Sequence, residues 1–100
     1  MELISFAELE PGLKLPKLAD SIDNGSYPHK EEIIQYLLNG KMYFFGLSLP
    51  KDVFTGEQIP MSDRVMQDGI YYWPTVLAWY VDKYNVRLPK EFEEHILSKK

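Results

Sequence analysis

The residues of this sequence with the clearest potential for chemistry are two histidines and a group of central carboxylates. His29 and His95 lie near opposite ends of the chain, and neither belongs to an HxxxH pair. Because a metal site needs several ligands at suitable spacing, we expect no metal ion and no cofactor at either histidine. The central carboxylates, Asp52, Glu57, Asp63 and Asp68, are spread through the chain between residues 47 and 69.

These residues could in principle support acid–base catalysis or nucleophilic catalysis. An acid–base enzyme needs carboxylates that converge in space, and the four central acids leave that possibility open. Solubility and turn formation explain the same acids more simply, since Asp is common where a loop turns. Nucleophilic catalysis has no candidate, because the chain has no cysteine and no Gly-x-Ser-x-Gly sequence. We therefore predict that the protein is not an enzyme, with a small enzyme using loop carboxylates as the alternative.

The stretch 68–92 contains the elements that must position several of these side chains. Asp68 and Gly69 predict a tight hairpin turn, because glycine accepts the positive φ that such turns require. The aromatic run 70–73 predicts a strand, and Pro74 suits the first turn of a helix. That helix has one apolar face at helical spacing, formed by Trp73, Leu77, Tyr80, Val81 and Tyr84.

Trp79 and Tyr71 each leave two interpretations open. At about 100° per residue, Trp79 lies on the far side of the helix from its apolar face. Either the N-terminal segment covers this ring, or the ring is exposed in the way that aromatic side chains at interfaces are. Tyr71 points to the opposite side of its strand from Ile70 and Tyr72, because side chains alternate along a strand. Both residues are therefore candidates for binding a partner.

The remainder of the chain adds two helices and a strand. Residues 28–39 predict a helix with Pro28 in its first turn and Gly40 at its end. The apolar run 41–46 follows at once and predicts a buried strand, while residues 47–67 predict a loop-rich connection.

The predicted fold class is therefore α+β, in a single domain that spans residues 1–100. A small antiparallel sheet contains residues 41–46 and the hairpin 65–73. About three helices pack with the sheet, near 28–39, 74–85 and 89–98.

Composition limits the functional classes. Fifteen acidic and eleven basic residues give a net charge of −4, which argues against a nucleic-acid ligand, because phosphate binding needs clustered Lys and Arg. No apolar run reaches the about 20 residues that span a membrane. The N-terminus also lacks the basic and apolar regions of a secretory signal. These features predict a cytoplasmic protein that binds neither nucleic acid nor a membrane.

A distinctive pattern runs through the second half of the sequence. Residues 68–80 read DGIYYWPTVLAWY, which fits DG-x-[WY]-x-WP-x-x-L-x-x-Y, and they lie between Thr55–Pro60 and a Leu88-Pro89 step. Over residues 55–92 the chain resembles a family of small, mostly uncharacterised bacterial proteins with this signature. In size and in acidic single-domain character, that family resembles the immunity proteins of bacterial toxin systems such as contact-dependent growth inhibition. The resemblance implies a shared fold signature and carries no catalytic role.

Together these features predict a non-enzymatic binding protein, namely an immunity protein that binds and occludes the active site of a toxin domain, in particular a nuclease. An acidic surface with aromatic side chains would complement the basic cleft of such a toxin. The candidate partner-binding residues are Asp52, Glu57, Asp63, Asp68, Tyr71 and Trp79. A structural or regulatory adaptor is a further alternative, and the sequence predicts no oligomeric state.

Overall fold

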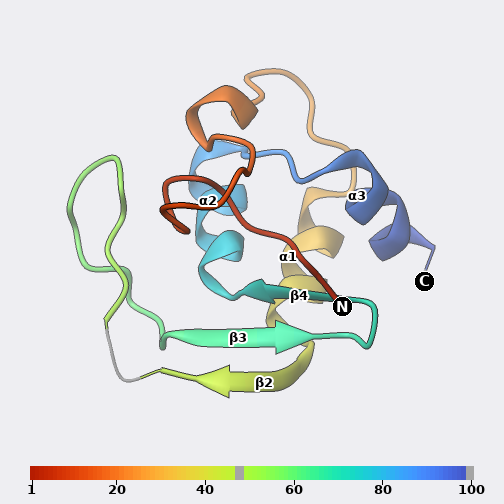
Figure 1. Ribbon diagram of the computed structural model, residues 1–100. Helices are drawn as coiled ribbons and strands as arrows, with labels where there is room; N and C mark the ends of the chain where they lie inside the picture. The colour runs from red at the N-terminus through yellow and green to blue at the C-terminus, as the bar shows by residue number, and fades with distance from the viewer. Residues whose placement is uncertain (47–48, 99–100) are drawn as a thin grey trace.

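The computed structural model describes residues 1–46 and 49–98, and shows a four-stranded sheet packed with three helices (Figure 1). The strands are β1 (Glu2–Leu3), β2 (Lys41–Phe45), β3 (Arg64–Gln67) and β4 (Tyr71–Pro74). The helices are α1 (Lys30–Leu38), α2 (Val76–Tyr84) and α3 (Lys90–Leu97), with a short 3-10 turn, η1, at Ala19–Ser21. The predicted α+β class is therefore confirmed. Residues 47–48 of the predicted loop lie outside the described part of the chain.

The sheet has the strand order β1-β4-β3-β2. Strands β2, β3 and β4 are antiparallel neighbours, as predicted. The N-terminal strand β1 adds to β4 in parallel, so the complete sheet is mixed. Because β2 is the last strand in this order, one of its two edges has no neighbour within the sheet.

The hairpin between β3 and β4 forms at the predicted turn. Gly69 has φ of +93°, which a side chain would make unfavourable. The Oδ1 atom of Asp68 accepts hydrogen bonds from the backbone N–H groups of Ile70 at 2.9 Å and Tyr71 at 2.7 Å. Pro74 is the last residue of β4, not part of the first helical turn, and α2 begins two residues later than that prediction implied.

Buried side chains of the three helices, the sheet and the N-terminal segment form the core. Trp73, Leu77 and Tyr80 are buried, which confirms that part of the predicted stripe, whereas Tyr84 is half-buried. The indole N–H of Trp73 donates to the backbone carbonyl of Leu37 at 3.0 Å and so ties β4 to α1. The close contact explains Gly40, because a Cβ there would lie 2.8 Å from Cζ2 of Trp73.

The prediction of a buried strand at residues 41–46 is wrong. All five residues of β2 are exposed, and Gly46 is half-buried. The reason is the strand order. The buried side chains of β3 and β4, Met66 and Trp73, face the helices, whereas β2 lies at the outer edge of the sheet, at the bottom of Figure 1. An apolar run predicts a strand, but it does not determine where in the sheet that strand will lie.

Candidate functional site

The structure places the six predicted partner-binding residues in three locations. Asp52, Glu57 and Trp79 meet where the loop after β2 crosses α2. Asp68 and Tyr71 belong to the hairpin, beside α1 and α3. The side chain of Asp63 lies close to Gly46. A Cβ atom added to Gly46 would clash with the carboxylate of Asp63. The acids therefore do not gather into one acidic face with Tyr71.

Asp52 is an internal carboxylate that organises its own loop. It is 1% exposed, and its Oδ2 atom accepts hydrogen bonds from Trp79 Nε1 at 3.0 Å and from the Tyr84 hydroxyl at 2.6 Å. Its Oδ1 atom accepts from the backbone N–H groups of Phe54 and Thr55. Burial acts to raise the pKa of Asp52, but the bonds from Tyr84, Trp79 and the backbone outweigh burial and lower it. The charged side chain thus fixes the loop onto α2.

Trp79 is half-buried and packs against the core. Its indole N–H donates to Asp52, so the loop that carries Asp52 lies against this ring. Lys83 lies over the ring, with Nζ 4.7 Å from the ring centroid, and the same Nζ pairs with Glu57 Oε1 at 3.3 Å. Glu57 is the one member of this group with an exposed carboxylate.

Asp68 is the centre of a second internal cluster. Its Oδ2 atom accepts hydrogen bonds from the Tyr36 hydroxyl of α1 and from His95 Nε2 of α3, the latter at 2.7 Å. Burial acts to raise the pKa of Asp68, but the bonds from Tyr36, the turn backbone and His95 together lower it to about 2. Tyr71 packs on His95 and Phe92, with ring centroids 4.9 and 5.0 Å apart. This cluster joins the hairpin to two helices.

The pairing of His95 with Asp68 was not predicted from the sequence. No sequence spacing could have indicated that pair, because 27 positions separate the two residues and two different elements carry them. The described residues contain no group of three or more His, Cys, Asp or Glu side chains that could hold a metal ion. The described contacts of the His95 imidazole are its hydrogen bond to Asp68 and ring contacts with Tyr36, Tyr71 and Phe92, so the Asp68–His95 pair links the hairpin to α3.

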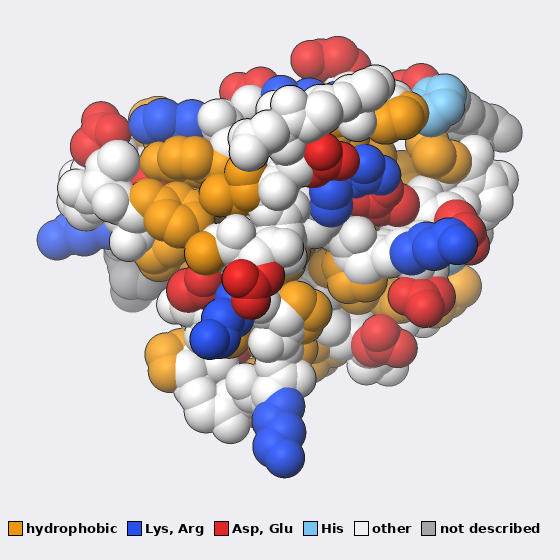
Figure 2. Space-filling model, turned by 90° about the horizontal axis from the view of Figure 1, so that it is seen from above, with side chains coloured by type: hydrophobic (Ala, Val, Ile, Leu, Met, Phe, Trp, Pro, Cys, Tyr) orange, Lys and Arg blue, Asp and Glu red, His pale blue; other side chains and the backbone are white. Residues whose placement is uncertain are grey.

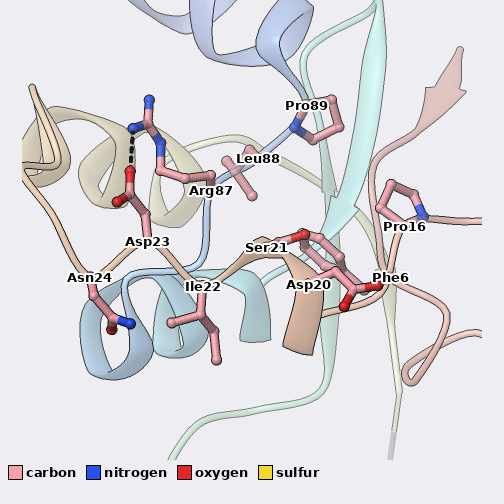
Figure 3. Close-up of a pocket in the computed structure, with 10 residues that line it drawn as sticks. All are labelled: Phe6, Pro16, Asp20, Ser21, Ile22, Asp23, Asn24, Arg87, Leu88 and Pro89. Atoms are coloured by element: carbon pink, nitrogen blue, oxygen red, sulfur yellow. Dashed lines mark hydrogen bonds and ion pairs between the residues drawn. The ribbon is translucent and has the colours of Figure 1, made fainter.

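A surface cavity of about 420 Å³ lies between the N-terminal segment and the chain that follows α2 (Figure 3). Its one basic lining residue in the described part of the chain, Arg87, is already paired. The guanidinium donates to Asp23 Oδ2 at 3.1 Å, as the dashed line in Figure 3 marks, and to both carboxylate oxygens of Glu93. Arg87 also lies over the ring of Tyr27, 4.4 Å from its centroid. Because each nitrogen of the Arg87 guanidinium already donates a hydrogen bond to Asp23 or Glu93, Arg87 is a poor binding group for an anionic ligand.

The clearest unexplained feature is the exposed apolar strand. We define the β2 patch as Met42, Tyr43, Phe44 and Phe45, whose exposed fractions lie between 51% and 61%. Contiguous exposed apolar surface is uncommon on monomeric proteins and marks interaction sites.

Figure 2 views the molecule from above, and so from the side away from β2. On this face acidic and basic side chains are interspersed, and hydrophobic side chains gather at one side.

The register shows which way the patch faces. Residues directly opposite one another on neighbouring strands share a face. Met42 lies opposite Met66, and Phe45 opposite Arg64, so both point to the side of the sheet that carries the buried Trp73.

The other half of the patch points to the opposite side. Phe44 lies opposite Val65, and Tyr43 is an extra residue inserted into β2 as a β-bulge. The ring of Tyr43 contacts that of Tyr72 edge-on, with centroids 5.6 Å apart. The patch therefore offers aromatic and apolar side chains on both sides of the sheet edge. Sequence reasoning missed it because a run without polar alternation is typical of a strand covered on both sides.

The chain matches no protein-family model, no curated protein and no solved structure. Within the described residues, none of the helices is both long and apolar enough to cross a membrane.

Proposed function

We propose that this chain is a non-enzymatic protein-binding domain whose partner packs on the β2 patch. The observation that carries the proposal is a strand of four consecutive large apolar side chains, Met42–Phe45, each more than half exposed. Leaving such side chains in water forgoes the favourable free energy of burying them, which a partner would recover. The bulge at Tyr43 and the charge of Lys41 disfavour extension of the sheet by a further strand. Contact through the side chains is the favoured geometry.

The size of the patch is consistent with a role at the centre of an interface. Large aromatic side chains offer about 150–250 Å² each, so the three aromatic side chains of the patch and Met42, all about half exposed, together contribute roughly 400 Å². A standard interface takes about 800 Å² from each partner. The patch thus supplies a core of aromatic anchors, and the surrounding surface supplies the rest.

In its most specific form, the proposal makes this chain a cytoplasmic immunity protein that occludes the active site of a toxin domain, in particular a nuclease. The resemblance of residues 55–92 to a family with that character supports this form. A basic toxin would be attracted by the net charge of −4. The exposed acid Glu57 remains a candidate rim contact, whereas Asp52 and Asp68 would act by holding the surface in shape.

The test starts from the gene directly upstream of this chain, where the immunity role predicts a large secreted protein with a variable C-terminal toxin domain. Co-expression should relieve the growth arrest that the toxin domain causes, and the purified proteins should inhibit at one molecule per toxin molecule. An enzyme would instead neutralise the toxin at much lower ratios. The Tyr43→Ser/Phe44→Ser variant should bind at least about 30-fold more weakly while keeping the wild-type melting temperature, because both side chains are exposed.

Leu13→Ser is the matched control, since Leu13 is similarly exposed but lies outside the β2 patch. It should bind as tightly as the wild type. Equal binding by the double variant and the wild type would contradict the proposed surface, and absence of a complex would contradict the immunity role.

A further inference from the structure

Arg64 carries a guanidinium that has no partner in the described structure. No hydrogen bond or ion pair joins its side chain to any described residue, and its Nε atom is buried without an acceptor. The nearest assigned contact is the ring of Phe45 in the β2 patch, whose centroid lies 5.8 Å from Cζ. A buried donor without an acceptor costs free energy, so such a group calls for an explanation.

The other arginine in the sequence shows what a satisfied guanidinium looks like in this fold. Arg87 bonds to two carboxylates and lies over Tyr27. The chain has fifteen acidic residues, yet none of those described is placed against Arg64. The difference between the two arginines therefore reflects position, not a shortage of acids.

Arg64 lines a cavity of about 210 Å³ beside the β2 patch. The other lining residues are Leu38, Met61, Ser62, Met66 and Thr75. The cavity is smaller than the 300–1,000 Å³ typical of small-molecule sites, and suits the insertion of a single side chain. Its walls combine apolar side chains with a fork of N–H donors.

We infer that Arg64 receives a carboxylate side chain of a partner protein, an Asp or Glu flanked by apolar residues that pack on Phe45 and Met42. This inference rests on the proposed function and names the anchor at the same surface. A planar guanidinium matches a carboxylate through two parallel hydrogen bonds. Among the described residues, Arg64 is the one cationic residue that lines the cavity, beside the apolar Leu38, Met61 and Met66, so the site favours a single carboxylate on an apolar stem over a free phosphate, which would require further cations. The overall charge of −4 steers a basic partner from a distance, and the single acidic anchor fixes its register.

The experiment follows the two arginine Nε–H signals of the full chain by ¹⁵N NMR. The probes are the peptides Ac-Phe-Glu-Leu-NH2 and Ac-Phe-Gln-Leu-NH2, with sodium acetate and inorganic phosphate in separate titrations. The Arg64 signal should shift in a saturable way with the Glu peptide, and the Gln peptide should bind roughly tenfold more weakly, because it lacks the charge. The Arg87 signal should stay in place as an internal control, since its Nε already donates to Glu93.

The Arg64→Gln variant should keep the fold and lose the response of the Phe45 amide to the Glu peptide. An equal response to both peptides would overturn the inference, as would the absence of any Arg64 shift. Acetate or phosphate that binds as tightly as the Glu peptide would also overturn it, because the site would then take a free anion. If a toxin complex forms and the Arg64 signal does not change in it, the inference about Arg64 is wrong and the immunity role stands. If the Glu peptide shifts the Arg64 signal and no toxin complex forms, the immunity role is wrong and the inference about Arg64 stands.

Discussion

At the scale of single residues, the buried carboxylates of this protein are structural. Asp52 and Asp68 both accept hydrogen bonds from aromatic side chains and from the backbone of their own turns. Each bond stabilises the charged form, so both groups remain ionised although Asp52 is buried and Asp68 is half-buried. The consequence is that two of the acids predicted to bind a partner act instead on the stability of the fold.

Asp68 should make stability depend on acid pH. Its folded pKa of about 2 lies below the value near 3.9 of an unfolded Asp. The stabilisation is therefore present above about pH 4 and is lost as the pH falls towards 2, with a magnitude on the order of 2 kcal/mol. Asp68→Asn should lower the free energy of unfolding at pH 7 by a similar amount, and urea titrations should show the gap to the wild type narrowing below pH 4. A gap that is constant from pH 7 to pH 2.5 would contradict this role.

Asp52 and Glu57 allow a comparison of a buried and an exposed carboxylate in the same loop, by the free energy of unfolding that each contributes. Asp52→Ala removes the acceptor for Trp79, Tyr84 and two backbone N–H groups, and should cost about 2–4 kcal/mol in the free energy of unfolding. Glu57→Ala removes an exposed ion pair with Lys83, and should cost less than about 1 kcal/mol. Chemical denaturation of both variants checks the comparison. Similar losses for the two variants would show that the loop is not held through Asp52.

At the scale of elements, α2 is the helix on which the core depends. Leu77 is fully buried, so Leu77→Ala should lower the free energy of unfolding by about 2–5 kcal/mol. Thermal melting measures this loss, with the exposed Leu13→Ala as the control. If the two variants melted at the same temperature, the assignment of the apolar face of α2 to the core would be wrong.

Local patterns in the sequence were sufficient to predict the hairpin and the three helices. Gly69 marks the turn, and the spacing of Leu77 and Tyr80 marks the buried face of α2, because both signals act over a few residues. The exposure of β2 depends on strand order, which arises from contacts between segments far apart in the chain. The same holds for the partners of Asp52 and Asp68, which come from other elements. No local spacing contains that information.

At the scale of the whole molecule, charge and apolar surface have separate roles. The net charge of −4 persists although Asp52, Asp68 and Glu93 are bonded internally, and it gives a weak long-range field. Such a field mainly raises the rate of association with a basic partner. In the proposed complex, the affinity comes from desolvated contacts, which we assign to the β2 patch.

The most direct test of this account is hydroxyl-radical footprinting of the chain, free and in complex with the toxin domain that the immunity role predicts directly upstream. Met42 and Met1 are a matched pair of reactive side chains, 54% and 56% exposed. We predict that oxidation of Met42 and Phe44 falls at least about fivefold in the complex, while that of Met1 is unchanged. Unchanged oxidation of the β2 patch, with protection of Phe54 and Val53 in the loop over α2, would contradict the account.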